Sequence, residues 1–219
     1  MLPTVTDIRN ALNAAGVQGV QGYCDKLEPN WRTPAVYRDL FSEAYAALMF
    51  ARSGFEVQMG ESPDLVLKHD GQSLGAEVKR FHRKQQDDID DQRMQEELTE
   101  YGNTVPTEGK EAWFQVEEVA LKKSSQLRTG IPNILVIESS SPNCIEETEI
   151  LSAVKLIDNR IARGIVGDIG RLNGIVFMSI EYSISRQRNV YFFEVSHADV
   201  PLSGELRLAL EAITEWTTG

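Results

Sequence analysis

Apolar residues recur three or four positions apart in several segments of the chain, which is the spacing that places them on one face of a helix. The clearest segment begins at Thr33-Pro34, an N-cap candidate followed by proline at the first helical position, and it ends at Gly54. A weaker pattern near the N-terminus predicts a short helix that stops at Gly16, followed by an irregular lead-in. Further helices are predicted over 111–128, 146–163 and 204–216.

After Gly54 the apolar and polar positions alternate, which is the period of a half-buried strand. Three strands are predicted there, over 55–59, 64–68 and 73–79. Asp70-Gly71, between the second and third strands, is the strongest short signal for a hairpin turn. Later strands are expected at 134–137 and, as a second hairpin, at 174–184 and 190–195.

The order of elements is helix, three strands, helix, strand, helix, two strands and helix. This order predicts an α/β fold in which a mixed sheet is flanked by helices. A length of 219 residues suits one domain. Within that domain, 1–219, we expect a lead-in over 1–32, a core over 34–137 and a C-terminal completion over 138–219. The core contains a polar, highly charged insertion over 82–110.

Composition and charge narrow the classes of function. Hydrophobic residues make up 42% of the chain and charged residues 25%, so an ordinary packed core is expected. The net charge of -11 argues against a protein that coats nucleic acid by bulk charge, although a local basic groove or bound cations remain compatible with it. No apolar run approaches the roughly 20 residues of a membrane span, and the N-terminus lacks the pattern of a signal peptide. Together with two distant cysteines, these features favour a cytoplasmic protein without a membrane contact.

The hairpin turn fixes which residues oppose each other. If Asp70-Gly71 forms a two-residue turn, His69 pairs with Gln72, and Asp64 then falls opposite Glu77 on one face of the sheet. Lys79 lies two residues beyond Glu77 and projects from the same face. Two carboxylates so close repel each other unless one is protonated or a cation lies between them. This cluster is costly for a core, so it points to chemistry.

A fourth acid, Glu43, lies at the edge of the apolar stripe of the first long helix and could be aimed at the same cluster. Asp64 and Glu77 offer the hard oxygen ligands that suit Mg²⁺ or Mn²⁺. Such an ion can bind a phosphate oxygen and lower the pKa of a bound water. Lys79 could orient or deprotonate that water, or steady the charge that develops on the phosphate. The set therefore favours phosphodiester hydrolysis.

The sequence here resembles the PD-(D/E)xK nuclease superfamily, whose fold is that of restriction endonucleases. Pro63-Asp64 followed, after a twelve-residue gap, by Glu77-Val78-Lys79 matches the superfamily signature, and the expected order of elements from 34 to about 137 resembles its αβββαβ core. The resemblance covers about half of the chain. It implies that Asp64, Glu77 and the backbone carbonyl of Val78 bind the metal and that Lys79 is the catalytic lysine. Glu43 resembles the accessory acid of the superfamily and could help to bind metal, by holding a metal-bound water or a second ion.

Five further residues are weaker candidates for nucleic-acid binding. On the helix after the insertion, Lys122 and Gln126 lie one turn apart and resemble the basic and amide residues that some members aim at the site. Their neighbours Lys123 and Arg128 are expected on the helix surface, as partners of the helix dipole. Three basic residues that follow the signature could bind phosphate or form a solvated run at a loop entrance: Arg80, Arg83 and Lys84.

The sequence therefore predicts a metal-dependent nuclease, with DNA favoured over RNA because most of the resembling superfamily acts on DNA. Two alternatives remain open: an RNA-cutting enzyme of the same fold, and a non-catalytic nucleic-acid-binding or assembly module that retains it. The net charge of -11 favours the module slightly and also favours work as a homodimer or beside a protein partner. An intact Asp64, Glu77 and Lys79 argue against a retired site.

Overall fold

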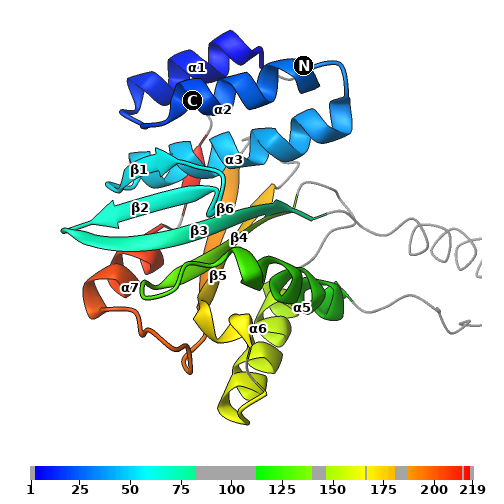
Figure 1. Cartoon of the computed structure of the whole chain (residues 1–219), viewed down its shortest axis with the longest axis vertical. Helices are drawn as coiled ribbons and strands as arrows, with labels where there is room; N and C mark the ends of the chain where they lie inside the picture. The colour runs from blue at the N-terminus through cyan, green and yellow to red at the C-terminus, as the bar shows by residue number, and fades with distance from the viewer. Residues whose placement is uncertain are drawn as a thin grey trace, which may run out of the picture.

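A single seven-stranded mixed sheet runs through the computed structural model, and its strands lie in chain order from β1 to β7 (Figure 1). The structure describes residues 3–81, 112–139, 147–165, 167–180, 187–213 and 215–217. The strands are β1 (Glu56–Met59), β2 (Leu65–His69), β3 (Gln72–Arg80), β4 (Asn133–Ser139), β5 (Leu172–Ile180), β6 (Gln187–Glu194) and β7 (Glu215–Thr217). β1, β2 and β3 pair antiparallel, β3, β4 and β5 pair parallel, and β5, β6 and β7 pair antiparallel.

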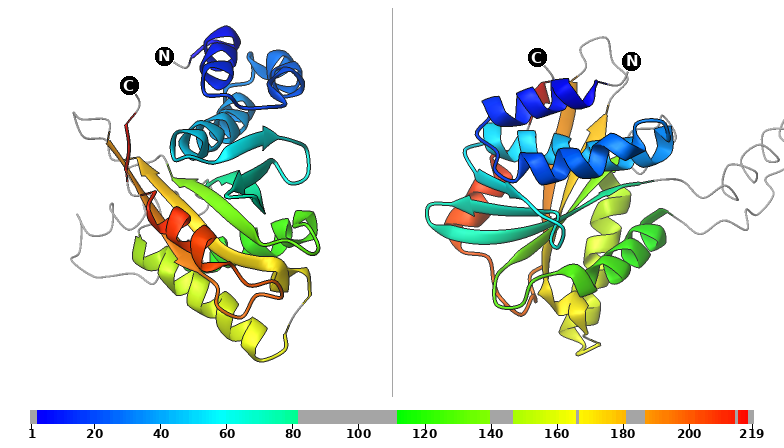
Figure 2. Two further views of the ribbon diagram at one scale, coloured as in Figure 1. Left: turned by 90° about the vertical axis from the view of Figure 1, so that its left-hand side faces the viewer. Right: turned by 45° about the horizontal axis from the view of Figure 1, so that its top comes forward.

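Helices cover both faces of this sheet, as the two views of Figure 2 show. On one face, α3 packs against β1–β3, with α1 and α2 against α3, and α7 joins the same apolar core. On the other face, α5 and α6 pack together with the central strands in a second core. The helical elements are α1 (Val5–Ala14), α2 (Val20–Leu27), η1 (Glu28–Asn30), α3 (Pro34–Arg52), α5 (Ala112–Lys123), η2 (Ser124–Gln126), α6 (Glu147–Ala162), η3 (Asp168–Arg171) and α7 (Gly204–Glu211).

The predicted hairpin register is confirmed. β2 and β3 pair from His69↔Gln72 to Leu65↔Ala76, which is the register set by a two-residue turn at Asp70-Gly71. Both turn residues have positive φ, 47° and 77°, as a type I′ hairpin turn requires. Asp64 lies just before the first residue of β2 rather than inside the strand.

The residues of β3 alternate between the two cores. Leu74, Ala76 and Val78 belong to the core beneath α3. Gly75, Glu77 and Lys79 therefore project toward the side of α5, because successive strand residues point to opposite faces. The predicted one-face placement of Glu77 and Lys79 follows from this alternation.

Two predictions about the ends of the chain are wrong. The lead-in is not irregular after Gly16, because α2 forms there with Gly22 inside it and with four buried residues, among them Tyr23 and Leu27, that pack into the core. Burial of that face outweighs the cost of a glycine in a helix. The last helix does not reach 216; it ends at Glu211, and residues 215–217 pair with β6 instead. That pairing gives the outer edge of β6 its backbone hydrogen bonds.

The polar insertion over 82–110 lies outside the described residues, and with it Arg83 and Lys84. In the part of the chain that the structure describes, no helix combines the length and the apolar character that crossing a membrane requires.

Candidate active site

Asp64 is positioned by the backbone of the neighbouring strand. The last paired residues of β2 and β3 are Leu65 and Ala76, and beyond them the side chain of Asp64 takes over: its Oδ2 accepts the N–H of Val78 at 2.8 Å. The carbonyl of Asp64 accepts the N–H of Gly60 at 2.9 Å, which closes the β1–β2 connection. The carboxylate is therefore fixed beside Glu77, and it is only 6% exposed.

Glu77 is the most deeply buried acid of the cluster, with 0% exposure. The ammonium group of Lys123 lies 2.7 Å from Glu77 Oε2 and 3.7 Å from Asp64 Oδ2, so it bridges the two acids. The other oxygen, Glu77 Oε1, is buried and has no hydrogen-bond partner among the described residues. Burial and then the negative charge of Asp64 raise the pKa of Glu77, although Lys123 opposes this shift.

Lys123 is the last residue of α5. Burial by itself would lower the pKa of Lys123, but the hydrogen bond to Glu77 and the charges of Asp64, Glu77 and Glu43 outweigh burial and raise it. The bridging group is therefore a cation throughout the neutral pH range.

Glu43 reaches the cluster from α3 and is nearly buried. Lys26 of α2 lies 3.1 Å and 3.2 Å from its two carboxylate oxygens. Burial and then the charge of Asp64 raise the pKa of Glu43 to about 7, with Lys26 and Lys123 opposing the shift. The structure thus brings Glu43 into electrostatic contact with Asp64, from the opposite side of the sheet to α5.

Lys79 projects from the same face as Glu77 but is not part of the ion-pair cluster. No hydrogen bond or ion pair joins it to the acids of the described residues. It lines a hollow of about 170 Å³ between the end of β3 and α5. The other lining residues are Arg80, Phe81, Gln115, Glu118, Val119 and Lys122. Three of the seven lining residues are basic and one, Glu118, is acidic, so the lining has an excess of basic residues that suits an anionic group.

The predicted helix residues occupy different places. Lys122 is exposed and lines the hollow, whereas Gln126 lies in η2 and is also exposed, with its backbone carbonyl accepting a hydrogen bond from Ser62. Neither side chain has a hydrogen bond or ion pair with the acids of the described chain. Arg80 lies 3.7 Å from Asp39 of α3 and also lines the hollow.

The sequence interpretation missed Lys123, which it placed on the helix surface. A signal was present: Val116 and Ala120 form the buried stripe of α5, and Lys123 falls three residues farther along that stripe, whereas Lys122 does not. A lysine that continues an apolar helix stripe needs a buried partner, and here that partner is Glu77.

The donor set fits a hard divalent cation. In the described residues, no group of three or more His, Cys, Asp or Glu side chains is arranged to hold a metal ion. Mg²⁺ does not require such a group, because protein sites commonly offer it one or two carboxylates and leave the other positions to water and phosphate. Asp64 and Glu77 supply two carboxylates, and Oε1 of Glu77 has no other partner in the described chain. The carbonyl of Val78 points to the same strand edge as its N–H, and that N–H already meets Asp64.

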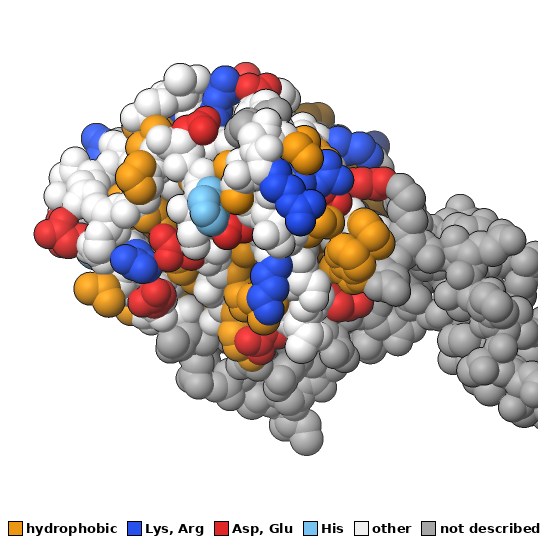
Figure 3. Space-filling view, turned by 90° about the horizontal axis from the view of Figure 1, so that it is seen from below, with side chains coloured by type: hydrophobic (Ala, Val, Ile, Leu, Met, Phe, Trp, Pro, Cys, Tyr) orange, Lys and Arg blue, Asp and Glu red, His pale blue; other side chains and the backbone are white. Residues whose placement is uncertain are grey.

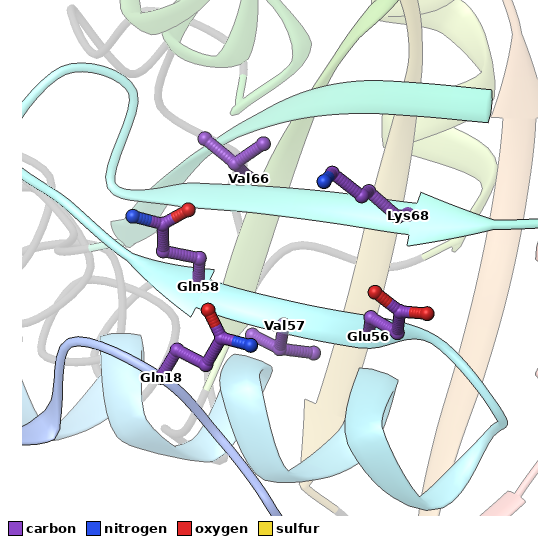
Figure 4. Close-up of a pocket in the computed structure, with 6 residues that line it drawn as sticks. All are labelled: Gln18, Glu56, Val57, Gln58, Val66 and Lys68. Carbon is purple, nitrogen blue, oxygen red and sulfur yellow. The ribbon is translucent and has the colours of Figure 1, made fainter. Parts of the chain in front are cut away.

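Two other features of the described surface do not resemble a substrate site. A hollow at the edge strand, lined by Gln18, Glu56, Val57, Gln58, Val66 and Lys68, measures only about 30 Å³ (Figure 4). That is space for about two water molecules. On the face seen in Figure 3, basic side chains stand in separate groups among acidic and apolar ones, as expected for a net charge of -11.

Comparisons with family models, curated proteins and solved structures found no match to this chain.

Proposed function

We propose that this protein is a metal-dependent nuclease of the PD-(D/E)xK type, with a restriction-endonuclease-like core. The observation that carries the proposal is the buried pair formed by Asp64, just before β2, and Glu77 of β3. One oxygen of Glu77 lacks a partner in the described chain, and Lys79 lies two residues beyond Glu77 on the same face. A purely structural pair has no reason to keep two repelling acids and an unsatisfied oxygen in the interior.

In this proposal Asp64, Glu77 and the carbonyl of Val78 hold Mg²⁺ or Mn²⁺. The ion, when bound, supplies a positive charge for the phosphate and lowers the pKa of a water molecule. Glu43 is held by Lys26 and has a pKa raised to about 7, in part by Asp64, so a cation bound at Asp64 would favour the ionised form of Glu43.

Lys79 and the hollow beside it receive the substrate. The basic side chains of Lys79, Arg80 and Lys122 line one space of about 170 Å³ at the end of β3, the strand that carries Glu77. A nucleic-acid backbone is the anion whose hydrolysis the acids suit. Lys79 then donates to the phosphate that is cleaved, or orients the attacking water, and so stabilises charge that develops in the transition state. DNA is the preferred substrate in this proposal, on the basis of the resemblance.

One observation favours a second candidate, a non-catalytic module. The ammonium group of Lys123 already neutralises the Asp64–Glu77 pair without any metal. A module of this kind would keep its fold with Lys123 in place and would gain no stability from Mn²⁺.

A cleavage assay with matched variants tests the nuclease. Wild type, Lys79→Ala and Lys68→Ala would each be incubated with double-stranded DNA, single-stranded DNA and RNA in Mg²⁺, Mn²⁺ or EDTA. We expect metal-dependent cutting that falls by about 10²- to 10³-fold in Lys79→Ala, the usual cost of one transition-state donor. Lys68, an exposed lysine of β2 outside the site, serves as the control and should keep full activity.

The same assay separates the alternatives. The substrate that is cut fastest decides between DNA and RNA. Equal activity in wild type and Lys79→Ala would contradict the assigned mechanism. If no substrate is cut, and Mn²⁺ also fails to raise the melting temperature, the module is the better description.

A further inference from the structure

Lys123 occupies the position that a cation must take between the two buried acids. Its Nζ lies 2.7 Å from Glu77 and 3.7 Å from Asp64, and Glu77 has no contact with solvent. Two ionised carboxylates at such a site are tolerated only while a positive charge lies between them. In the described chain, Lys123 is the group that supplies this charge.

A divalent ion and the ammonium group exclude each other from this position. Two positive charges about 4 Å apart repel strongly even at an effective dielectric constant of about 20. Both would also bind the same carboxylate group, since Oε2 of Glu77 already accepts the hydrogen bond from Lys123. Metal binding to both acids is therefore opposed as long as Lys123 remains in place.

The side chain of Lys123 is able to leave. It is 25% exposed, and it extends from the last residue of α5. A lysine is a point charge on a flexible four-carbon stem, which can move aside without unfolding the helix that carries it.

We propose that Lys123 is a resident counter-ion of the acid pair, which holds Asp64 and Glu77 in place before a divalent cation arrives and is displaced when the cation binds. This proposal deepens the proposed function, because it assigns a control of metal loading to the same site. Its consequence is a reduced apparent affinity for the metal. If the arrangement with Lys123 in place is about 90–99% populated, the apparent Kd is about 10- to 100-fold higher than the intrinsic one.

Direct titration of the metal tests this consequence without any cleavage. Mn²⁺ would be titrated into wild type, Lys123→Met and Lys155→Met by calorimetry. Lys155 is an exposed lysine of α6, so its substitution removes the same charge from the surface of another helix. We expect Lys123→Met to bind Mn²⁺ at least about tenfold more tightly than wild type, and Lys155→Met to match wild type.

A second measurement uses the wild-type protein and covers the case in which Lys123→Met does not fold. Lysines would be acetylated with a water-soluble ester in EDTA and in saturating Mn²⁺, and the rate at each site read by mass spectrometry. Displacement predicts that Lys123 reacts several-fold faster with Mn²⁺, whereas its exposed neighbour Lys122 reacts at one rate. An unchanged rate at Lys123 when Mn²⁺ is bound would overturn the proposal.

The outcomes separate this proposal from the proposed function. Tighter binding by Lys123→Met supports both. Binding by wild type that is equal or weaker in Lys123→Met overturns the counter-ion and leaves the metal site standing. Absence of binding in wild type and in Lys123→Met overturns the metal site, and the counter-ion with it.

Discussion

Two buried polar side chains, Asn133 and Glu77, lie near each other on the same face of the sheet, but their polar atoms are satisfied to different extents. Asn133 of β4 lies against Gly75 of β3, where the pairing of these two strands begins. Glu77 lies two residues beyond Gly75 on the same face of β3. Asn133 and Glu77 are both 0% exposed. The two side chains differ in whether each of their polar atoms has a hydrogen-bond partner.

Asn133 is fully partnered. Its Nδ2 donates to the carbonyls of Arg128 and Ile131, each at 2.9 Å, and its Oδ1 accepts the N–H of Arg128 at 2.9 Å. Its own N–H donates to the side chain of Asn173 at 2.8 Å. These bonds tie the α5–β4 connection to the sheet, so the buried amide has a structural role.

Glu77 is only partly partnered, as one oxygen meets Lys123 and the other meets no described group. A second acid lies beside it and raises its pKa. The difference teaches that burial alone does not mark a functional group. Buried polar groups that serve the fold are satisfied, whereas groups poised for a ligand keep unsatisfied capacity at a cost in stability.

The largest change in stability is expected for substitution of Asn133, the residue with the structural role. Asn133→Ala should lower the free energy of unfolding by about 4 kcal/mol, because several buried backbone groups lose their partners and each costs about 1–3 kcal/mol. Urea unfolding followed by circular dichroism measures the change. A loss below about 1 kcal/mol would mean that water replaces the amide, and the contrast with Glu77 would be lost.

The second-largest change in stability is expected at the cluster of Asp64, Glu77 and Lys123, and its size depends on the metal. Lys123→Met should lower the unfolding free energy of the metal-free protein by about 3 kcal/mol, since removing one partner of a buried ion pair costs about 3–5 kcal/mol and protonation of Glu77 recovers part of it. Saturating Mn²⁺ should restore much of the loss. Thermal unfolding of wild type and variant in EDTA and in Mn²⁺ measures both parts, and equal losses under the two conditions would contradict the prediction.

A smaller loss of stability is expected at Gly75, where the backbone of β3 lies close to the side chain of Asn133. A Cβ on Gly75 would lie 2.4 Å from Asn133 Oδ1, and that atom is held by its hydrogen bond. Gly75→Ala should therefore lower the unfolding free energy by about 2 kcal/mol, within the usual range for overpacking. Gly22→Ala in α2 is the control: a Cβ there meets nothing within 4 Å, so the protein should keep or gain stability. Gly71→Ala is not a useful control, because φ is 77° there and alanine would be strained.

The hairpin and its acids could be predicted from the sequence because their geometry is local. Asp70-Gly71 defines the turn, the turn defines the register, and the register puts Asp64 beside Glu77. Lys123 continues the apolar stripe of α5, but it was missed because its partner Glu77 lies on a strand 46 residues away in the chain. The helix α2 and the strand β7 were missed for a related reason: burial of Tyr23 and Leu27, and the open edge of β6, are properties of the assembled fold.

The smallest change in stability should come from the residue that matters most for the proposed chemistry. Glu77→Gln keeps the shape of the side chain, removes the repulsion by Asp64 and weakens the bond to Lys123, so the two effects oppose each other. We expect the unfolding free energy in EDTA to change by less than about 1 kcal/mol, because Asp64 still balances the charge of Lys123 and no buried charge is left uncompensated. Stabilisation by Mn²⁺ should disappear. Thermal unfolding with and without Mn²⁺ measures both results, and Asn133→Ala is the counterpart, because it should lose stability and keep its response to Mn²⁺. A Glu77→Gln protein that is strongly destabilised in EDTA, like Asn133→Ala, would mean that Glu77 serves the fold and that Glu77 and Asn133 do not differ in role.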